Sequence, residues 1–331
     1  MPAAKKKLNE TNIVELAKQF FLESLKDSTY TSLIKTSLGD DCFGFLPPSS
    51  FTITVTTDVL VEGVHFDLKW INPYELGQRA INVNFSDLAS QGARPAFVFL
   101  GLGIKRGTTM RFWRKFYEGA LSVCRTQGAV LGGGDTNSAR ELTIAVTAIG
   151  FATAEMKRSS ARPGDLIAVT GKLGRAAAGY LALKKGLNDS ALKSAVKSFL
   201  ICQHRVEEGI KLAEAGVKCC EDISDGLARD LSNIATASDI GFVVYLEKIP
   251  VADELYYIRD QYGEEKIYEA ALTFGDDYEL VFTASEKVLQ RAKEMGVDFT
   301  VIGKMTAEKK QLFIDEQGNE TSIATGYLHH F

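Results

Sequence analysis

Aspartate residues that neighbour glycine, serine or threonine recur along this 331-residue chain, mostly where an apolar stretch ends. Glycine beside a carboxylate lets the backbone approach a ligand closely, unlike the setting of an acid on a solvated helix face. Each cluster taken singly is also typical of a turn or a helix cap, and that interpretation stays open. The acids of this kind are Asp40, Asp41, Asp58, Asp87, Asp135, Asp222, Asp225, Asp276 and Asp277.

Carboxylates that converge without basic partners repel one another and raise each other's pKa unless cations lie between them. Mg²⁺ suits dispersed single acids, because it commonly joins one or two carboxylates to substrate phosphates and water. Zinc is disfavoured, since the four histidines have no metal-ligand spacing. His65 follows the strand that ends at Asp58, so it could face a ligand or pack inside the fold.

Two segments could bind phosphate through backbone N–H groups. Leu131–Asp135 contains three consecutive glycines, for which a flexible turn is the alternative interpretation. Ser224–Gly226 offers a hydroxyl, a carboxylate and the amides of a helix start, or an ordinary N-cap. A Walker A motif is absent because Leu173 follows Lys172 where Ser or Thr is required. The chain also lacks the dinucleotide fingerprint of a strand, GxGxxG and a helix.

Composition excludes several classes of protein. The chain has 38 basic and 42 acidic residues and a net charge of −4, so it has no electrostatic footprint for nucleic acid. Its hydrophobic content of 45% is enough for two packed cores, which argues against disorder. No stretch approaches about 18 uninterrupted apolar residues, so we expect no membrane partner.

The five cysteines form no CxxC pair, and their odd number does not suggest a disulfide framework. We therefore expect reduced thiols and a cytoplasmic location. Cys42 has no histidine nearby in sequence, and no GxSxG elbow occurs. The sequence thus predicts no covalent catalytic nucleophile.

The elements that would position these residues alternate between helical and strand patterns. Phe51–Asp58 alternates apolar and threonine side chains, as a half-buried strand does. Asn72 and Pro73 supply a cap and a first-turn proline for a helix. In the N-terminal half we expect a helix over 11–27 capped by Asn12 and Glu15, a strand over 51–58, a helix from 73 to about 91, a strand over 96–104, a helix over 109–127, a short strand into 131–135 and a strand over 142–151.

A turn signal at Ala161–Asp165 indicates that a second domain begins near this point. There we expect a strand over 166–170, helical stretches over 174–186 and 190–215, a helix opened by Asp222–Gly226, and strands near 241–246, 279–284 and 299–303. Helices and strands in both halves predict an α/β fold class of α+β type. The expected domains are residues 1–152 and 153–331.

Taken in order, the motifs resemble those of the thiamine-monophosphate kinase family, within the aminoimidazole-ribonucleotide synthetase-like superfamily. The resemblance covers the chain from about residue 14 to its end. It is carried by the segments Leu38–Asp41, Thr56–Phe66, Asn84–Pro95, Gly132–Thr136, Asp222–Leu227, Phe274–Leu280 and Gly326–Tyr327.

This resemblance implies a homodimer of two-domain subunits. The N-terminal domain would bind metal and ATP and dimerise through its sheet, and the C-terminal domain would close over a cleft. The implied reaction is ATP- and Mg²⁺-dependent phosphorylation of thiamine monophosphate to thiamine diphosphate, by direct in-line transfer of the γ-phosphate.

The resemblance also implies three sets of site residues. The metal set is Asp41, Thr56, Thr57, Asp58, Asp87, Asp135, Asp222 and Asp225. The ATP set is Gly134, Asp135, Arg158 and Ser224. The substrate set is His65, Asp276 and Tyr327.

Two departures from the family pattern affect the substrate set. Asp276 stands where the family often has the longer Glu, and Ala324 stands where many relatives have an aromatic residue. Three alternatives stay open: another superfamily enzyme, a metal-dependent phosphohydrolase, and a non-catalytic nucleotide-binding protein. Selenide chemistry would need a cysteine in a mobile N-terminal segment, and residues 1–38 contain none.

Overall fold

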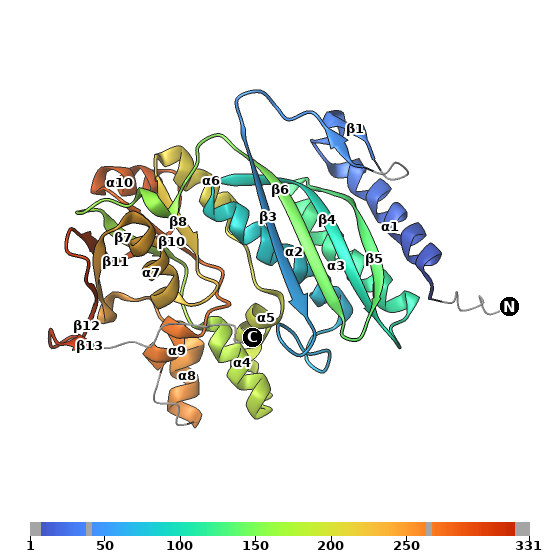
Figure 1. Cartoon of the computed structure of the whole chain (residues 1–331). Coiled ribbons are helices and arrows are strands. Elements are labelled where there is room, and N and C mark those ends of the chain that lie inside the picture. The colour runs from blue at the N-terminus through green and yellow to red at the C-terminus, as the bar shows by residue number, and fades with distance from the viewer. Residues whose placement is uncertain (1–7, 38–41, 263–266, 322–331) are drawn as a thin grey trace. The chain divides into compact units, whose positions relative to one another are not determined.

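The computed structural model describes residues 8–37, 42–262 and 267–321. The chain divides into two compact units (Figure 1). The first unit contains the residues up to Leu88 together with Arg94–Phe151, and the second contains Ala89–Ala93 and the residues from Ala152 onward. Helices and strands occur in both units, so the expected α+β class is confirmed. The roles expected for the two domains remain predictions.

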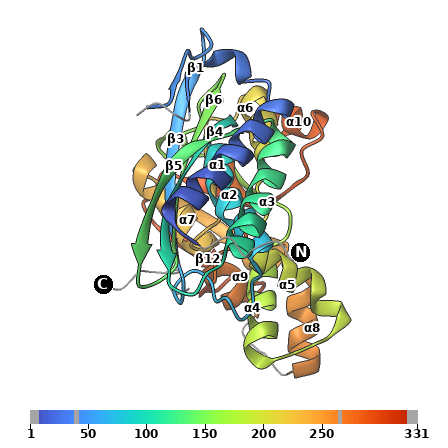
Figure 2. The ribbon, with the colours of Figure 1, turned by 90° about the vertical axis from the view of Figure 1, so that its right-hand side faces the viewer.

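The first unit is built on a four-stranded sheet with the strand order β3-β6-β4-β5. Its strands are β3 (Thr52–Val61), β4 (Ala93–Lys105), β5 (Val130–Ala139) and β6 (Thr143–Ala152). Three helices lie on one face of this sheet: α1 (Glu10–Ser24), α2 (Pro73–Ser90) and α3 (Met110–Gln127) (Figure 2). The short strands β1 (Ile34–Thr36) and β2 (Gly44–Phe45) pair with each other as a separate antiparallel ribbon.

Local capping explains where these helices begin. Asn72 Oδ1 accepts the backbone N–H of Glu75 at 3.0 Å, and Glu75 Oε2 accepts the N–H of Asn72 at 3.0 Å, which completes a capping box for α2. The cap expected at Asn12 is wrong. Asn9 caps α1 instead, by accepting the N–H of Asn12 at 2.9 Å, and the α-helix ends at Ser24.

Helices α2 and α3 touch through their backbones at two glycines. A Cβ atom on Gly77 would lie 2.0 Å from the carbonyl oxygen of Phe116, and one on Gly119 would lie 1.9 Å from that of Tyr74. Only glycine permits this approach, because real Cβ atoms do not come so close to backbone oxygen. The contact fixes the position of α2, the helix that carries Asp87.

The second unit has a seven-stranded sheet with the order β13-β12-β9-β11-β7-β10-β8. Its strands are β7 (Leu166–Thr170), β8 (Cys219–Asp222), β9 (Gly241–Tyr245), β10 (Leu280–Ala284), β11 (Phe299–Thr306), β12 (Gln311–Ile314) and β13 (Glu320–Thr321). Its helices are α4 (Arg175–Lys185), α5 (Lys193–Ile201), α6 (Val206–Ala215), α7 (Leu227–Ser238), α8 (Asp253–Tyr262), α9 (Ile267–Thr273) and α10 (Glu286–Glu294). The 3-10 turns include Leu25–Asp27 after α1 and Arg158–Ser160 before β7.

The helix expected over 190–215 is broken into α5 and α6. Cys202 has a φ of +47°, which ends α5, and Arg205 precedes the first residue of α6. Apolar periodicity continues across the break, so it could not reveal the interruption. Within the described ranges, no helix combines the length and apolar character needed to cross a bilayer.

The glycine contact between α2 and α3 generates a stability prediction. We expect Gly119→Ala to lower the free energy of unfolding by about 1–3 kcal/mol, because its Cβ overpacks the helix crossing. Alanine favours a helix over glycine by about 1 kcal/mol, so helix propensity alone predicts the opposite sign. Chemical denaturation measures the difference, with the exposed α3 variant Arg114→Ala as control. A Gly119→Ala variant as stable as the original chain would contradict the close approach.

Candidate active site

A threonine on β3 contacts an aspartate on α2 in the first unit. The Oγ1 atom of Thr56 donates a hydrogen bond to Oδ2 of Asp87, which lies 31 positions later in the chain. Asp58 is two residues beyond Thr56, so its side chain leaves β3 on the same face. Three oxygen-bearing side chains are thus gathered between one strand and one helix.

Burial, together with the nearby charge of Asp87, raises the pKa of Asp58 to about 7. Two carboxylates are therefore close enough to repel each other in a site where water does not screen them fully. A bound cation would relieve this repulsion. The donors here are carboxylate and hydroxyl oxygens, the kind of ligand that Mg²⁺ prefers.

Thr57 occupies the opposite face of the same strand. Its Oγ1 atom donates to the carbonyl oxygen of Val146 at 3.0 Å and lies 3.2 Å from Oγ1 of Thr147. The hydroxyls of Thr56 and Thr57 consequently point to different sides of the sheet. A ligand that lies beside Asp58 and Asp87 can therefore contact only the backbone atoms of Thr57, not its hydroxyl.

His65 lies in a turn after β3. Its Nδ1 atom accepts the backbone N–H of Val61 at 3.1 Å, so the neutral ring carries its proton on Nε2. The backbone N–H of His65 also donates to the carbonyl oxygen of Val61, at 2.9 Å. Both bonds orient the imidazole relative to the end of the strand that carries Asp58.

The glycine run, for which phosphate binding and a flexible turn were both open, lies inside β5. Gly133 pairs with Phe99, Gly134 with Leu100 and Asp135 with Gly101 in a parallel ladder with β4. Gly134 has a φ of +150°, and a Cβ there would lie 1.9 Å from the carbonyl oxygen of Leu100. These glycines serve a close approach of two strands, and Asp135 leaves β5 as an exposed side chain.

The second unit contains another group of acids, at the end of β8 and the start of α7. Asp222 ends the strand and is 3% exposed. Asp225 forms an ion pair with Nε of Arg229 at 2.9 Å, and its backbone N–H donates to Oδ2 of Asp230 at 3.1 Å. Burial, with the charges of Glu221, Asp222 and Asp225, raises the pKa of Asp230 to about 9.

Glu221 joins this group from inside β8. Its Oε1 atom accepts from Nη2 of Arg158 at 2.9 Å and from Nδ2 of Asn233 at 2.9 Å. Burial is the main cause of a rise in the pKa of Glu221 to about 7, and the contacts with Asn233 and Arg158 partly offset it. Because only 2% of Glu221 is exposed while the Arg158 side chain is 55% exposed, the guanidinium is held on one side and open on the other.

Glu221 and Asp230 are absent from the sequence-based site. Glu221 lies in β8, a strand that was not predicted from the sequence, so its carboxylate gave no separate signal. Asp230 shares the helix face of Leu227, Leu231 and Ile234, all of them buried. An acid on an apolar face at that spacing was the signal that could have identified it.

Asp276 lies beside the loop that follows β8. Its backbone N–H donates to the carbonyl oxygen of Ser224 at 2.9 Å, and the N–H of Tyr278 donates to that of Ile223 at 2.9 Å. The segments Asp222–Gly226 and Phe274–Leu280, more than 40 positions apart, are thus hydrogen-bonded neighbours.

The predicted residues form two groups, one in each unit. Thr56, Asp58 and Asp87 are brought together in the first, and Asp222, Ser224, Asp225 and Asp276 in the second. Asp41 and Tyr327 lie outside the described residues. Over the part of the chain that the structure describes, no set of three or more His, Cys, Asp or Glu side chains has a geometry that could hold a metal ion.

Comparison with known families assigns both units to one class. Residues 39–152 match the N-terminal domain of AIR synthase related proteins, and residues 162–315 match the C-terminal domain. Together these matches cover more than half of the chain. The fold and its acidic loops therefore define a two-domain protein of the AIR synthase related class.

Individual relatives narrow the class. A thiamine-monophosphate kinase of Buchnera aphidicola subsp. Acyrthosiphon pisum (strain APS) is 36% identical over 283 residues, which cover 81% of this chain and 84% of the relative. The crystal structure of thiamine-monophosphate kinase from Stenotrophomonas maltophilia K279a matches with a TM-score of 0.79 and 29% identity, over 92% of this chain and 96% of that one. A structure described as AaThiL complexed with AMPPCP and TMP matches with a TM-score of 0.76 and 26% identity, over 96% and 97%.

The chain belongs to the thiamine-monophosphate kinase family and is accordingly an enzyme. The resemblance identified from the motifs is confirmed.

The paired carboxylates of the first unit generate a titration prediction. We expect Asp87→Asn to lower the pKa of Asp58 from about 7, because one negative charge is removed. Burial is the larger cause and remains, so the pKa should stay above its ordinary value of 3.8. Carboxyl ¹³C NMR of the metal-free protein measures the change, with Asp67→Asn as a control outside the pair. An unchanged Asp58 titration in Asp87→Asn would show that the two carboxylates do not interact.

Proposed function

We propose that this protein transfers the γ-phosphate of ATP to thiamine monophosphate and so forms thiamine diphosphate. The observation that carries the proposal is the similarity, over 96% of the chain, to a structure in complex with AMPPCP, an ATP analogue, and TMP. Membership of the thiamine-monophosphate kinase family supports the same reaction.

We propose Mg²⁺ as the metal, held by the set that the family resemblance implies: Asp41, Thr56, Thr57, Asp58, Asp87, Asp135, Asp222 and Asp225. When bound, Mg²⁺ would neutralise phosphate charge and align the reacting groups. The raised pKa of Asp58 beside Asp87 supports a cation at that place. Asp58 and Asp135 lie on strands three steps apart in the sheet, about 14 Å between backbones, which favours several ions over one shared ion.

Residues of both units would bind the two anionic substrates. For ATP these are Gly134, Asp135, Arg158 and Ser224. Arg158 suits this role because Glu221 anchors its guanidinium while more than half of the side chain stays exposed to phosphate oxygens. For thiamine monophosphate they are His65, Asp276 and Tyr327, and the carboxylate of Asp276 would attract the cationic thiazolium ring.

The reaction needs little proton transfer. A phosphate oxygen of thiamine monophosphate attacks the γ-phosphorus in line, the bond from that phosphorus to the bridging oxygen breaks, and ADP leaves. The attacking oxygen is largely ionised near neutral pH, so no general base and no covalent nucleophile is required. The residues act by alignment and by stabilising charge.

We also propose that the protein is a homodimer that forms through the open face of the first sheet. Apolar side chains point outward at alternate positions of β3: Ile53 is 42% exposed, Val55 62% and Val59 48%. A second copy would cover this row. A sedimentation mass near one chain at micromolar protein would rule the dimer out. The free cysteines of the described residues support a cytoplasmic location.

Incubation with ATP, Mg²⁺ and thiamine monophosphate tests the reaction, with thiamine monophosphate omitted as the control. Thiamine diphosphate and ADP in equal amounts are the expected products. Free phosphate instead would indicate a phosphohydrolase. Tight ATP binding without turnover would indicate a nucleotide-binding protein that has the fold and lacks the activity.

Removal of one carboxylate should separate catalysis from folding. We expect Asp87→Asn to lower kcat/KM by roughly 100-fold or more, because a metal clamp contributes several kcal/mol to such transfers. Its thermal transition should change little, since Asn keeps an oxygen that can accept from Thr56. Asp67→Asn serves as the matched control in the same unit. Near-normal turnover of Asp87→Asn at saturating Mg²⁺ would remove Asp87 from the site.

A further inference from the structure

The segment Phe274–Leu280 has an unusual backbone. Gly275, Asp276 and Tyr278 all have positive φ values, of +80°, +58° and +52°. A left-handed conformation is uncommon for residues other than glycine, and for a bulky residue such as tyrosine it is a clear outlier. Such strain persists only where the surroundings hold it in place.

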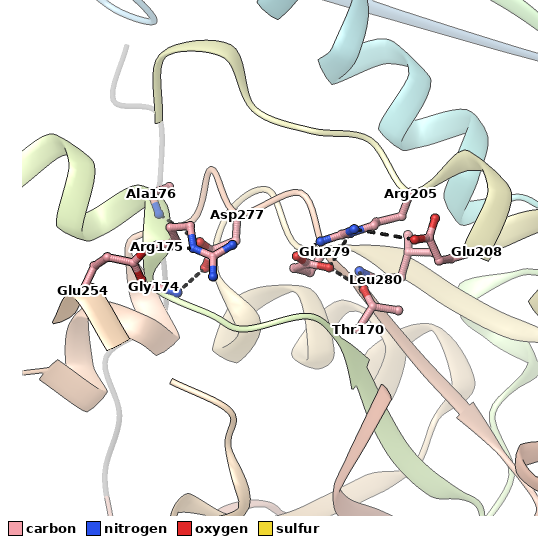
Figure 3. A network of polar contacts seen from close by, with 10 residues as sticks. All are labelled: Thr170, Gly174, Arg175, Ala176, Arg205, Glu208, Glu254, Asp277, Glu279 and Leu280. Atoms are coloured by element: carbon pink, nitrogen blue, oxygen red, sulfur yellow. Dashed lines mark hydrogen bonds and ion pairs between the residues drawn. The ribbon is translucent and has the colours of Figure 1, made fainter. Parts of the chain in front are cut away.

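Asp277 ties this segment to the start of α4 (Figure 3). Its carboxylate accepts the backbone N–H of Gly174 at 2.6 Å and that of Ala176 at 3.2 Å. The residue at the N-cap position of α4 is Gly174, which has no side chain, so Asp277 provides the cap from about 100 positions away. The positive end of the helix dipole also favours a carboxylate there.

Glu279 ties the other end of the segment to β7 and to the start of α6 (Figure 3). Its Oε2 atom accepts from Oγ1 of Thr170 at 2.6 Å and from Nε of Arg205 at 2.7 Å, and Oε1 pairs with Nη2 of Arg205. Oγ1 of Thr170 in turn accepts the backbone N–H of Leu280 at 2.8 Å. Gly171 leaves room for the Glu279 carboxylate, because a Cβ at position 171 would lie 2.2 Å from it.

Asp276 lies immediately before these anchors. It is half-buried, and its backbone N–H is bonded to the carbonyl oxygen of Ser224. The three acids of this stretch, Asp276, Asp277 and Glu279, thus have different surroundings. Asp277 and Glu279 are bound to backbone and side-chain groups of other elements. These bonds hold the left-handed conformations of the neighbouring residues Asp276 and Tyr278 in place.

We propose that Asp277 and Glu279 are positioning residues, whose contacts with α4, Thr170 and Arg205 hold Asp276 in its left-handed conformation and set the place of its carboxylate. This inference rests on the proposed function, in which Asp276 contacts thiamine monophosphate. Loss of either anchor lets the segment relax toward ordinary φ values and moves the Asp276 carboxylate. A displacement of about 1 Å at a reacting site can cost about 100-fold in rate.

Kinetics of three variants test the inference. Asp277→Ala and Glu279→Gln should raise KM for thiamine monophosphate by about 10- to 100-fold, as loss of supporting contacts commonly does, with a much smaller change in KM for ATP. Asp277→Asn keeps one acceptor oxygen and should recover part of the loss. The control is Asp189→Ala, which removes a similar cap: Asp189 Oδ1 accepts the N–H of Ala191 at 2.9 Å in the same unit.

Amide hydrogen exchange provides a readout that does not depend on activity. The N–H groups of Asp276 and Tyr278 should exchange faster in Asp277→Ala and Glu279→Gln than in Asp189→Ala, at equal thermal stability. Unchanged exchange and unchanged KM in a folded variant of either anchor would overturn the positioning role. If the unmodified protein forms no thiamine diphosphate, the proposed function fails by itself, and exchange alone then decides the role of the anchors.

Discussion

Repulsion between carboxylates that are partly withdrawn from water is the constraint on which both units depend. Asp58 and Asp87 share one face between β3 and α2, and Glu221, Asp222, Asp225 and Asp230 share the region around β8 and α7. In both places burial and neighbouring charge raise the pKa of an acid, to about 7 for Asp58 and about 9 for Asp230. A fold has no reason to gather such groups for its own stability, because each raised pKa is a free-energy cost of the ionised state. The cation that we propose for this site would offset that cost.

The buried and half-buried acids of this fold have two kinds of surroundings. Some acids are neutralised within the chain: Glu279 binds Arg205 and Thr170, Asp225 pairs with Arg229, and Asp277 accepts two amides at the start of α4. In the pair of Asp58 and Asp87, Asp87 accepts a hydrogen bond from the hydroxyl of Thr56, and its charge raises the pKa of Asp58. The bonds of Glu279 and Asp277 hold loops in shape, whereas Asp58 and Asp87 belong to the set that we propose for a cation. Residue type alone does not distinguish the two uses, because both rely on aspartate or glutamate beside small residues.

Rigid backbone contacts bring these acids to their places. Gly77 and Gly119 let α2 and α3 touch, which fixes the helix that carries Asp87. Gly134 lets β5 approach β4, so that Asp135 leaves a strand paired with β4. Backbone bonds between residues 223–224 and residues 276–278 join two loops that are distant in sequence. At Gly77, Gly119 and Gly134, glycine therefore serves the close packing of two elements.

The sequence by itself predicted the properties that depend on residues a few positions away. The cap at Asn72, the alternation along β3 and the loop acids follow from local hydrogen bonding and periodicity, and the ordered motifs were enough to identify the family. Other features depended on partners far along the chain. The Thr56–Asp87 bond, the burial of Glu221 and Asp230, the strand conformation of the glycine run and the break at Cys202 all required the tertiary structure. The physical reason is that burial, charge proximity and backbone strain are set by whatever packs against a residue, whereas helix caps and side-chain periodicity are set within a few positions of it.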